Sequence, residues 1–425
     1  QVLGFDPRTV SLVLIGAMVI DALVDPLIGR LSDATRTRFG RRLPWLYGAA
    51  VPMAIAWALL WVSPDIAQHS TLGLIVNVVA VRILVSACEI PSVSLVAELT
   101  RDYDERTTLM RFRFLFGWLG GLTATALAYG YFLTSDEPGQ SGLLEAAGYT
   151  EFGLFGAAMI LVTTLGSALG QHRRIVSLPP PPAAGHGNSM LADIALAFRN
   201  PAFVALVSGA LFIVTGYATA IASINYMMLY VWQLGDAQFA WYPLGLAIAV
   251  FGAFAAVGRA HRRFGKRDTA ITAALFSGAL AFVPYAARNL GFWPELGGTA
   301  SVFLLLGFMT LSLFGQIVAN ISAASMVAEI VEAHEVDHGT RIEGVFFAGY
   351  LMTQKFGQAL GIFLVGQLVA FAGLGERMRP EDLPADTATQ MGWIYAGLMV
   401  AIGVLAAVGL RRYAIDRASH EARLA

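Results

Sequence analysis

The chain has 425 residues, of which 56% are hydrophobic and 13% are charged. Its mean hydropathy of +0.63 is too apolar for a soluble protein of this length, so the composition predicts a membrane protein. The net charge of −1 argues against a general attraction to nucleic acid. The single cysteine, Cys88, excludes an intrachain disulfide.

Apolar stretches recur along the chain, each near the ~20 residues that a helix needs to cross a bilayer. They are continuous and do not alternate, which favours an all-α membrane protein over a transmembrane β-barrel. Eleven membrane-spanning helices are therefore expected. Their predicted bounds are 9–32, 44–63, 72–98, 108–134, 152–174, 200–232, 239–259, 269–288, 298–331, 343–373 and 389–412.

An internal repeat predicts how these helices are organised. Residues 36–42 read RTRFGRR and residues 262–267 read RRFGKR. The second motif follows two spans of its half, whereas the first follows only one, so the first half is expected to lack its opening helix. A Pro- and Gly-rich linker at 175–199 separates the expected N-terminal bundle, 1–174, from the C-terminal bundle, 200–425. The resulting prediction is a protein of two six-helix bundles whose first helix is missing from this chain.

The basic residues predict an orientation in the membrane. Alternate loops and the C-terminal tail hold 21 of the 28 lysines and arginines. Because basic loops remain on the cytoplasmic side, we expect a multi-pass protein with its C-terminus in the cytoplasm, in a bacterial inner membrane.

Two acids, Asp21 and Asp25, lie in the middle of the first apolar stretch. Residues four apart share one face of a helix. An ionised carboxylate at bilayer depth costs about 3 kcal/mol on insertion scales, and two of them repel unless a positive charge lies between them. The pair therefore predicts a cation site, with a structural use of the two acids as the alternative.

Further charges lie within predicted spans. Glu89 is followed by a helix-disturbing proline, and Arg82, Arg113 and Lys355 lie at comparable depth. These acids and bases can satisfy one another by converging on one interior cavity. The alternative is a set of buried structural ion pairs.

Two loops predict a gate on the cytoplasmic side. In the loop at 29–42, Asp33 can cap a helix or pair with an arginine, so that such pairs could hold the cytoplasmic side shut. In the loop at 334–344, two histidines and an aspartate lack a convincing fourth metal ligand, so a gate is favoured over a metal site. The expected gate residues are Gly29, Asp33, Arg38, Gly40, Arg41, Arg341 and Glu343.

Three motifs resemble one known family. These are DALVDPLIGRLSDATRTRFGRRLPW at 21–45, EIPSVSLV at 89–96 and DHGTRIEG at 337–344. Together they resemble the glycoside–pentoside–hexuronide:cation symporters of the major facilitator superfamily. The resemblance covers nearly the whole chain. It implies two six-helix bundles that expose a central cavity to one side of the membrane at a time.

The resemblance also implies roles for single residues. Asp21, Asp25, Glu89 and Ser86 match the positions that form the cation site of the family. The substrate-binding or coupling residues are expected to be Arg113, Lys355 and Tyr350. Val24 and Val93 depart from the family pattern, so the sequence does not name the sugar.

The predicted function is cation-coupled symport of a sugar or glycoside, with Na⁺ or H⁺ as the coupling ion and no other cofactor or metal. We expect a monomer in the lipid bilayer that binds a small-molecule substrate and no nucleic acid. A carrier of lysolipids or other amphiphiles and a non-transporting scaffold or sensor remain alternatives. No nucleophile–base pair or metal set in the sequence indicates an enzyme.

Overall fold

The structure is a computed structural model, and it describes residues 5–62, 71–100, 103–135, 141–177, 197–338, 343–374, 380 and 383–414. These residues form eleven long α-helices and no β-strand. The all-α prediction and the number of long helices are thus confirmed for the described part of the chain. The described chain divides into two compact units, and each is treated below by itself.

The first unit takes in residues 13–187, whereas residues 6–12, at the start of its first helix, group with the second unit. Its described residues include five long helices. They are α1 (Pro7–Ala34), α2 (Leu43–Val62), α4 (Thr71–Leu99), α5 (Tyr103–Leu127) and α6 (Ala146–Val176). A short π-helix, η1 (Ala128–Phe132), extends α5, and the 3₁₀ turn η2 (Gly142–Leu144) precedes α6.

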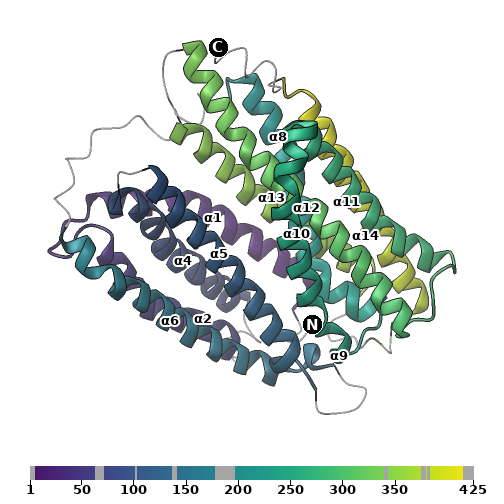
Figure 1. The fold of residues 1–425 in the computed structure, drawn as a ribbon. Helices are drawn as coiled ribbons and strands as arrows, with labels where there is room; N and C mark the ends of the chain where they lie inside the picture. Colours follow the sequence, from purple (N-terminus) through teal and green to yellow (C-terminus); the bar gives the residue numbers. More distant parts are fainter. Residues whose placement is uncertain are drawn as a thin grey trace. The chain divides into compact units, whose positions relative to one another are not determined.

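The second unit comprises residues 188–425 together with residues 6–12. Its described residues include six long helices, several of which run side by side in Figure 1. They are α8 (Pro201–Tyr226), α10 (Tyr242–Phe264), α11 (Lys266–Asn289), α12 (Thr299–His338), α13 (Glu343–Phe371) and α14 (Ala385–Arg411). The π-helix η3 (Met227–Val231) ends α8, and the short α9 (Asp236–Phe239) precedes α10.

Nine of the helices in the described residues are long and apolar enough to cross a membrane. The remaining two long helices, α5 and α13, fall short of this measure and carry the charged residues Arg113 and Lys355. A charged side chain in a spanning helix is costly unless it faces a protein interior or an aqueous cavity. These two helices are therefore candidates for lining a polar site.

The predicted bounds need one substantial correction. The helix expected to end at residue 331 continues to His338, so the first part of the expected loop 334–344 is helical. The extension VEAHEV contains the good helix formers Glu332, Ala333 and Glu335, which explains the longer helix. The predicted linker, 175–199, lies largely outside the described residues.

Glycines allow close helix contact in the second unit. A Cβ placed on Gly361 of α13 would lie 2.6 Å from the Cβ of Ala218 on α8. A Cβ on Gly357 would lie 2.8 Å from the carbonyl oxygen of Leu211. Small residues are the usual means of close helix packing in lipid, and here they bring α8 and α13 together.

Candidate functional site

The first predicted cation ligands meet between α1 and α4. The Ser86 hydroxyl donates a 2.6 Å hydrogen bond to Oδ1 of Asp21, and both side chains are buried. The helices are held there by a small apolar cluster that includes Ile28, Ala49 and Ala87. The serine that the family resemblance assigned to the cation site therefore lies against the first of its acids, and Asp25 lies one helical turn further along α1.

Glu89 lies beside a basic group. Nη2 of Arg113 on α5 is 4.0 Å from Oε1 of Glu89, and Nη1 of Arg113 donates a 3.1 Å hydrogen bond to Ser92. The Glu89 side chain is 63% exposed, so this ion pair contributes little stability. Within the described residues no three Asp, Glu, His or Cys side chains gather as metal ligands. Among the described residues, Glu89 thus does not form a three-acid metal site with Asp21 and Asp25.

The arginine-rich loop of the first unit is organised by Asp33. The buried Arg42 donates hydrogen bonds to the Ser32 hydroxyl and to the Asp33 carboxylate, and Nη1 of Arg41 lies 3.6 Å from the same carboxylate. Gly40 has a φ of +84°, a conformation that favours glycine. The turn at this glycine directs the basic residues back onto the end of α1.

The remaining predicted gate residues have different surroundings. Arg38 lies over the ring of Phe39, with its guanidinium carbon 4.6 Å from the ring centre. A Cβ on Gly29 would lie 3.9 Å from Ile90, an ordinary contact, so close packing does not require glycine there. Arg341 and the side chain of Glu343 lie outside the described residues.

The predicted coupling residues of the second unit lie on α13. Tyr350 is 3% exposed, and Lys355 is partly buried about one and a half turns further along. Their predicted roles in substrate binding or coupling stay predictions, because the two units are described separately.

The second unit repeats the glycine-turned loop with a different partner. Gly265 has a φ of +77°, and Nζ of the following Lys266 lies 2.9 Å from Oε1 of Glu329 on α12. The buried Tyr413 donates a 3.0 Å hydrogen bond to Oε2 of the same carboxylate, and Arg267 donates to the carbonyl oxygen of Tyr413. Burial raises the pKa of the Tyr413 phenol well above its usual value, and the Glu329 carboxylate raises it further.

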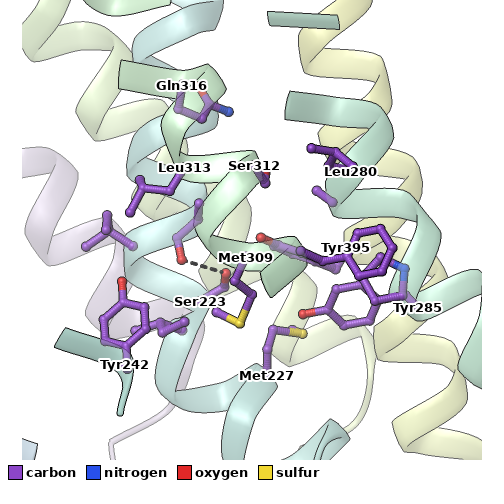
Figure 2. Close-up of a pocket in the computed structure, with 16 residues that line it drawn as sticks. Ser223, Met227, Tyr242, Leu280, Tyr285, Met309, Ser312, Leu313, Gln316 and Tyr395 are labelled. Carbon is purple, nitrogen blue, oxygen red and sulfur yellow. Dashed lines mark hydrogen bonds between the residues drawn. The ribbon is translucent and has the colours of Figure 1, made fainter. Parts of the chain in front are cut away.

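A cavity of about 50 Å³ lies inside the second unit (Figure 2). Its lining comes from α8, α10, α11, α12 and α14 and from the first residue of η3. Polar groups on its wall include Ser223, Ser312, Gln316, Tyr285 and Tyr395, and no lining residue is charged. Figure 2 shows the Tyr285 and Tyr395 hydroxyls directed towards the side of the cavity formed by Ser223 and Met227.

Sequence reasoning missed Arg42 and the cavity. Arg42 could have been found from the repeat, because it occupies the same place after the glycine as Arg267 in the second motif. The cavity residues are ordinary serine, tyrosine and glutamine positions in apolar helices, so only the packing of five helices brings them together.

Comparisons with known proteins agree with the all-helical architecture. The family model described as MFS/sugar transport protein matches residues 1–417. An uncharacterized symporter of Synechocystis is 27% identical over 90% of this chain and 82% of its own length. The isoprimeverose transporter of Lactiplantibacillus pentosus is 25% identical over 98% of this chain and 83% of its own length.

A solved structure shares the fold. A bacterial homologue of the human lysosomal transporter Spinster, in an inward-facing and unoccupied conformation, has a TM-score of 0.59. It is 18% identical, and the match covers 98% of this chain and 96% of that one. Because the family model spans nearly the whole chain, this multi-pass membrane protein belongs to the MFS sugar transport proteins, which confirms the family resemblance of its motifs.

Proposed function

We propose that the protein is a secondary active transporter that couples the entry of a sugar or glycoside to the entry of Na⁺ or H⁺. The observation that carries this proposal is the buried hydrogen bond from Ser86 to Asp21, between two helices that are long and apolar enough to span a membrane. Relatives named as symporters and as an isoprimeverose transporter support the same class of cargo and coupling.

The chemistry of the pair favours a cation. The Ser86 hydroxyl donates its hydrogen to the Asp21 carboxylate, and hydroxyl and carboxylate oxygens are both ligands of hard cations. Asp25, one turn along the same helix, adds a second carboxylate on the same face. Hard cations prefer such oxygen ligands, and a bound proton would relieve the same repulsion by neutralising one of the two carboxylates.

Coupling to the substrate is expected to involve Glu89 and Arg113. Their 4.0 Å separation is a loose ion pair, so either group can be recruited at low cost. A cation that neutralises the acids of α1 would allow Glu89 to join them and release the Arg113 guanidinium, with its planar hydrogen-bond donors, for sugar hydroxyls. Thermodynamic linkage then requires that substrate tighten cation binding by the same factor.

The site is expected to be exposed to each side of the membrane in turn, as the two bundles move about it. The arginine-rich loops would face the cytoplasm of a bacterial cell, since basic loops remain inside. Each monovalent cation that enters would gain about 2.3 kcal/mol per 100 mV of membrane potential, which can drive sugar accumulation. The transporter is expected to act as a monomer, because one pair of bundles provides one ion and sugar pathway.

Flux measurements in proteoliposomes test the proposal. Purified protein is reconstituted, and uptake of labelled isoprimeverose, xylose, glucose, galactose and a lysolipid is followed under an imposed Na⁺ gradient, an imposed H⁺ gradient or neither. We expect one sugar to accumulate under one of the two gradients. Uphill transport without an ion gradient would refute the coupling, and accumulation of the lysolipid alone would transfer the protein to the amphiphile carriers.

A matched pair of variants connects the flux to the site. Asp21→Asn removes the charge beside Ser86, whereas Asp386→Asn makes the same change at an exposed position in the first turn of α14. We expect the first variant to lose gradient-driven accumulation and the second to retain it. Equal accumulation by both variants would remove Asp21 from the cation site.

A further inference from the structure

The cavity of the second unit contains a buried amide that is not used within the bundle. Gln316 on α12 is 5% exposed and lines the cavity, and no hydrogen bond joins its amide to another residue in the described part of the chain. An amide that has no partner in the protein normally hydrogen-bonds to a water molecule or a ligand. The amide of Gln316 is therefore available to a hydrogen-bonding molecule in the cavity.

The opposite wall offers hydroxyl groups. Tyr285 and Tyr395 are 4% and 7% exposed, and their ring centres lie 5.0 Å apart. Their hydroxyls point into the cavity from α11 and α14 (Figure 2). The Ser223 hydroxyl donates a long, 3.3 Å hydrogen bond to the carbonyl oxygen of Ala220. Hydroxyl and amide groups both donate and accept hydrogen bonds, as a molecule with several hydroxyls requires.

The other residues that line the cavity are uncharged and mostly apolar, which disfavours an ion and favours the carbon atoms of a neutral ligand. None of the lining residues is charged, and the thioether side chains of Met227 and Met309 lie between the polar walls (Figure 2). A cavity needs roughly 10–15 Å³ to hold one water molecule, and this one offers about 50 Å³. The space is thus larger than one water requires, and adaptable methionines border it.

The position of the cavity is also suited to a change in shape. Met227 begins the π-helix η3, where the backbone bonds shift by one residue and Trp232 N–H donates to the Met227 carbonyl oxygen at 2.9 Å. Single π-turns occur mostly at functional sites. The main chain beside the cavity is therefore the part of α8 whose hydrogen-bond pattern departs from the regular helix.

We propose that this cavity is a subsite for a neutral, hydroxyl-bearing group the size of one edge of a sugar ring, recognised by Gln316, Tyr395 and Ser223. The inference rests on the proposed sugar transport and adds to it: Arg113 of the first unit is proposed to bind sugar hydroxyls, and the uncharged pocket of the second unit supplies further contacts that help to select the sugar. Substrates with a free carboxylate or phosphate at this edge are excluded, because no lining residue would neutralise the charge.

Site-directed thiol modification, in which the reagent converts a cysteine into its methyl disulfide and releases methanesulfinate, tests the subsite without measuring transport. The only native cysteine is replaced by Cys88→Ala, and one new cysteine is placed in the cavity by Met309→Cys. Methyl methanethiosulfonate, a small neutral reagent, is applied with and without xylose, glucose, galactose or isoprimeverose. The matched control is Met159→Cys, at a 45% exposed position of α6 in the first unit.

We expect at least one sugar to slow modification at position 309 about ten-fold while leaving position 159 unchanged. Adding Gln316→Leu or Tyr395→Phe should remove most of this protection. Gln171→Leu, which deletes an amide that bonds within α6, should leave it intact. Elution volume and helical circular dichroism show whether each variant is folded.

Two results would overturn the inference. One is modification at position 309 that no sugar slows in folded protein; the other is protection that survives both Gln316→Leu and Tyr395→Phe. The outcome is separable from that of the proposed function. Protection at position 309 without ion-driven uptake would refute the coupled transport and keep the subsite, whereas ion-driven sugar uptake without protection would refute only the subsite.

Discussion

Helices α5 and α13 carry the same Phe-Gly-x-x-x-Gly spacing, FGWLGG at 116–121 and FGQALG at 356–361. In the second unit, α8 packs against these glycines so closely that a Cβ on Gly361 would collide with Ala218. In the first unit, no heavy atom of the described residues lies within 4 Å of a Cβ placed on Gly121. The pattern therefore encodes a face for helix docking, but the stabilisation arises only where a partner helix is present.

The two units differ in their polar groups as well. In the first unit, the long helices α1, α4 and α5 carry four charged residues, Asp21, Asp25, Glu89 and Arg113. In the second unit, no residue that lines the cavity is charged. A charge and a hydroxyl ligand need different surroundings, because an ion must be neutralised while a neutral ligand needs only hydrogen bonds. The proposed cation ligands thus all lie in the first unit, whereas the second unit contributes uncharged groups for the sugar.

The largest expected effect comes from Asp25→Asn, which removes one acid of the charged unit. We expect the steady-state accumulation of sugar to fall about 100-fold, while exchange of sugar across the membrane continues, since exchange needs no net cation movement. Glu89→Gln, at an exposed residue paired with Arg113, should cost less than about ten-fold. Counterflow and gradient-driven uptake in the same proteoliposomes measure both. Unchanged accumulation in Asp25→Asn would contradict the division between the units.

The two glycine-turned loops give the next largest difference. Glu329 is 16% exposed and bonds to both Lys266 and Tyr413, so Glu329→Ala should lower the free energy of unfolding by about 2 kcal/mol. Asp33 is 45% exposed, and Asp33→Ala should cost about 1 kcal/mol or less. Thermal unfolding in one detergent compares the two variants. A larger loss of stability from Asp33→Ala than from Glu329→Ala would show that the loop of the first unit contributes more to stability.

The helix faces that contain Gly361 on α13 and Gly121 on α5 can be compared by Gly→Ala substitutions. Gly361→Ala places a methyl group 2.6 Å from Ala218, and overpacking of this kind costs about 1–3 kcal/mol. Gly121→Ala meets no described neighbour and should raise helix stability by up to about 1 kcal/mol. Paired melting curves measure the difference. Equal destabilisation would mean that the Gly121 face of α5 is packed as tightly as its counterpart.

The smallest effect is a pH dependence of the second loop. The pKa of Tyr413 lies above its ordinary value of 10.0 in the folded protein, so its contribution is complete below pH 10. Above pH 10 the unfolded chain loses the proton while the folded protein keeps it. The free energy of unfolding should therefore fall by about 1 kcal/mol between pH 10 and 11. Tyr413→Phe should lose that part of the slope, and a slope unchanged in this variant would assign it to other groups.

Much of the fold could be predicted from the sequence. The predicted helices recur in the structure, since a bilayer-spanning helix satisfies its own backbone hydrogen bonds and needs only a long apolar run. The end of α12 was wrong by seven residues, because a charged but helix-favouring segment prolongs the helix beyond its apolar part. For the candidate site, the structure joins Asp21 to Ser86 and places Glu89 beside Arg113, and the roles of these residues in cation binding stay predictions.

The sequence by itself determined that this protein resides in a lipid bilayer. It also determined the helices, the repeated loops and the acids that lie at membrane depth. Each of these depends on hydropathy, spacing and charge along one segment. Only the tertiary structure decided that Arg42 holds Asp33, that Glu329 joins Lys266 to Tyr413, and that an uncharged cavity forms around Gln316. Those arrangements depend on which helix faces come together. Contacts between residues that are tens of positions apart or more cannot be predicted from the sequence of any one segment.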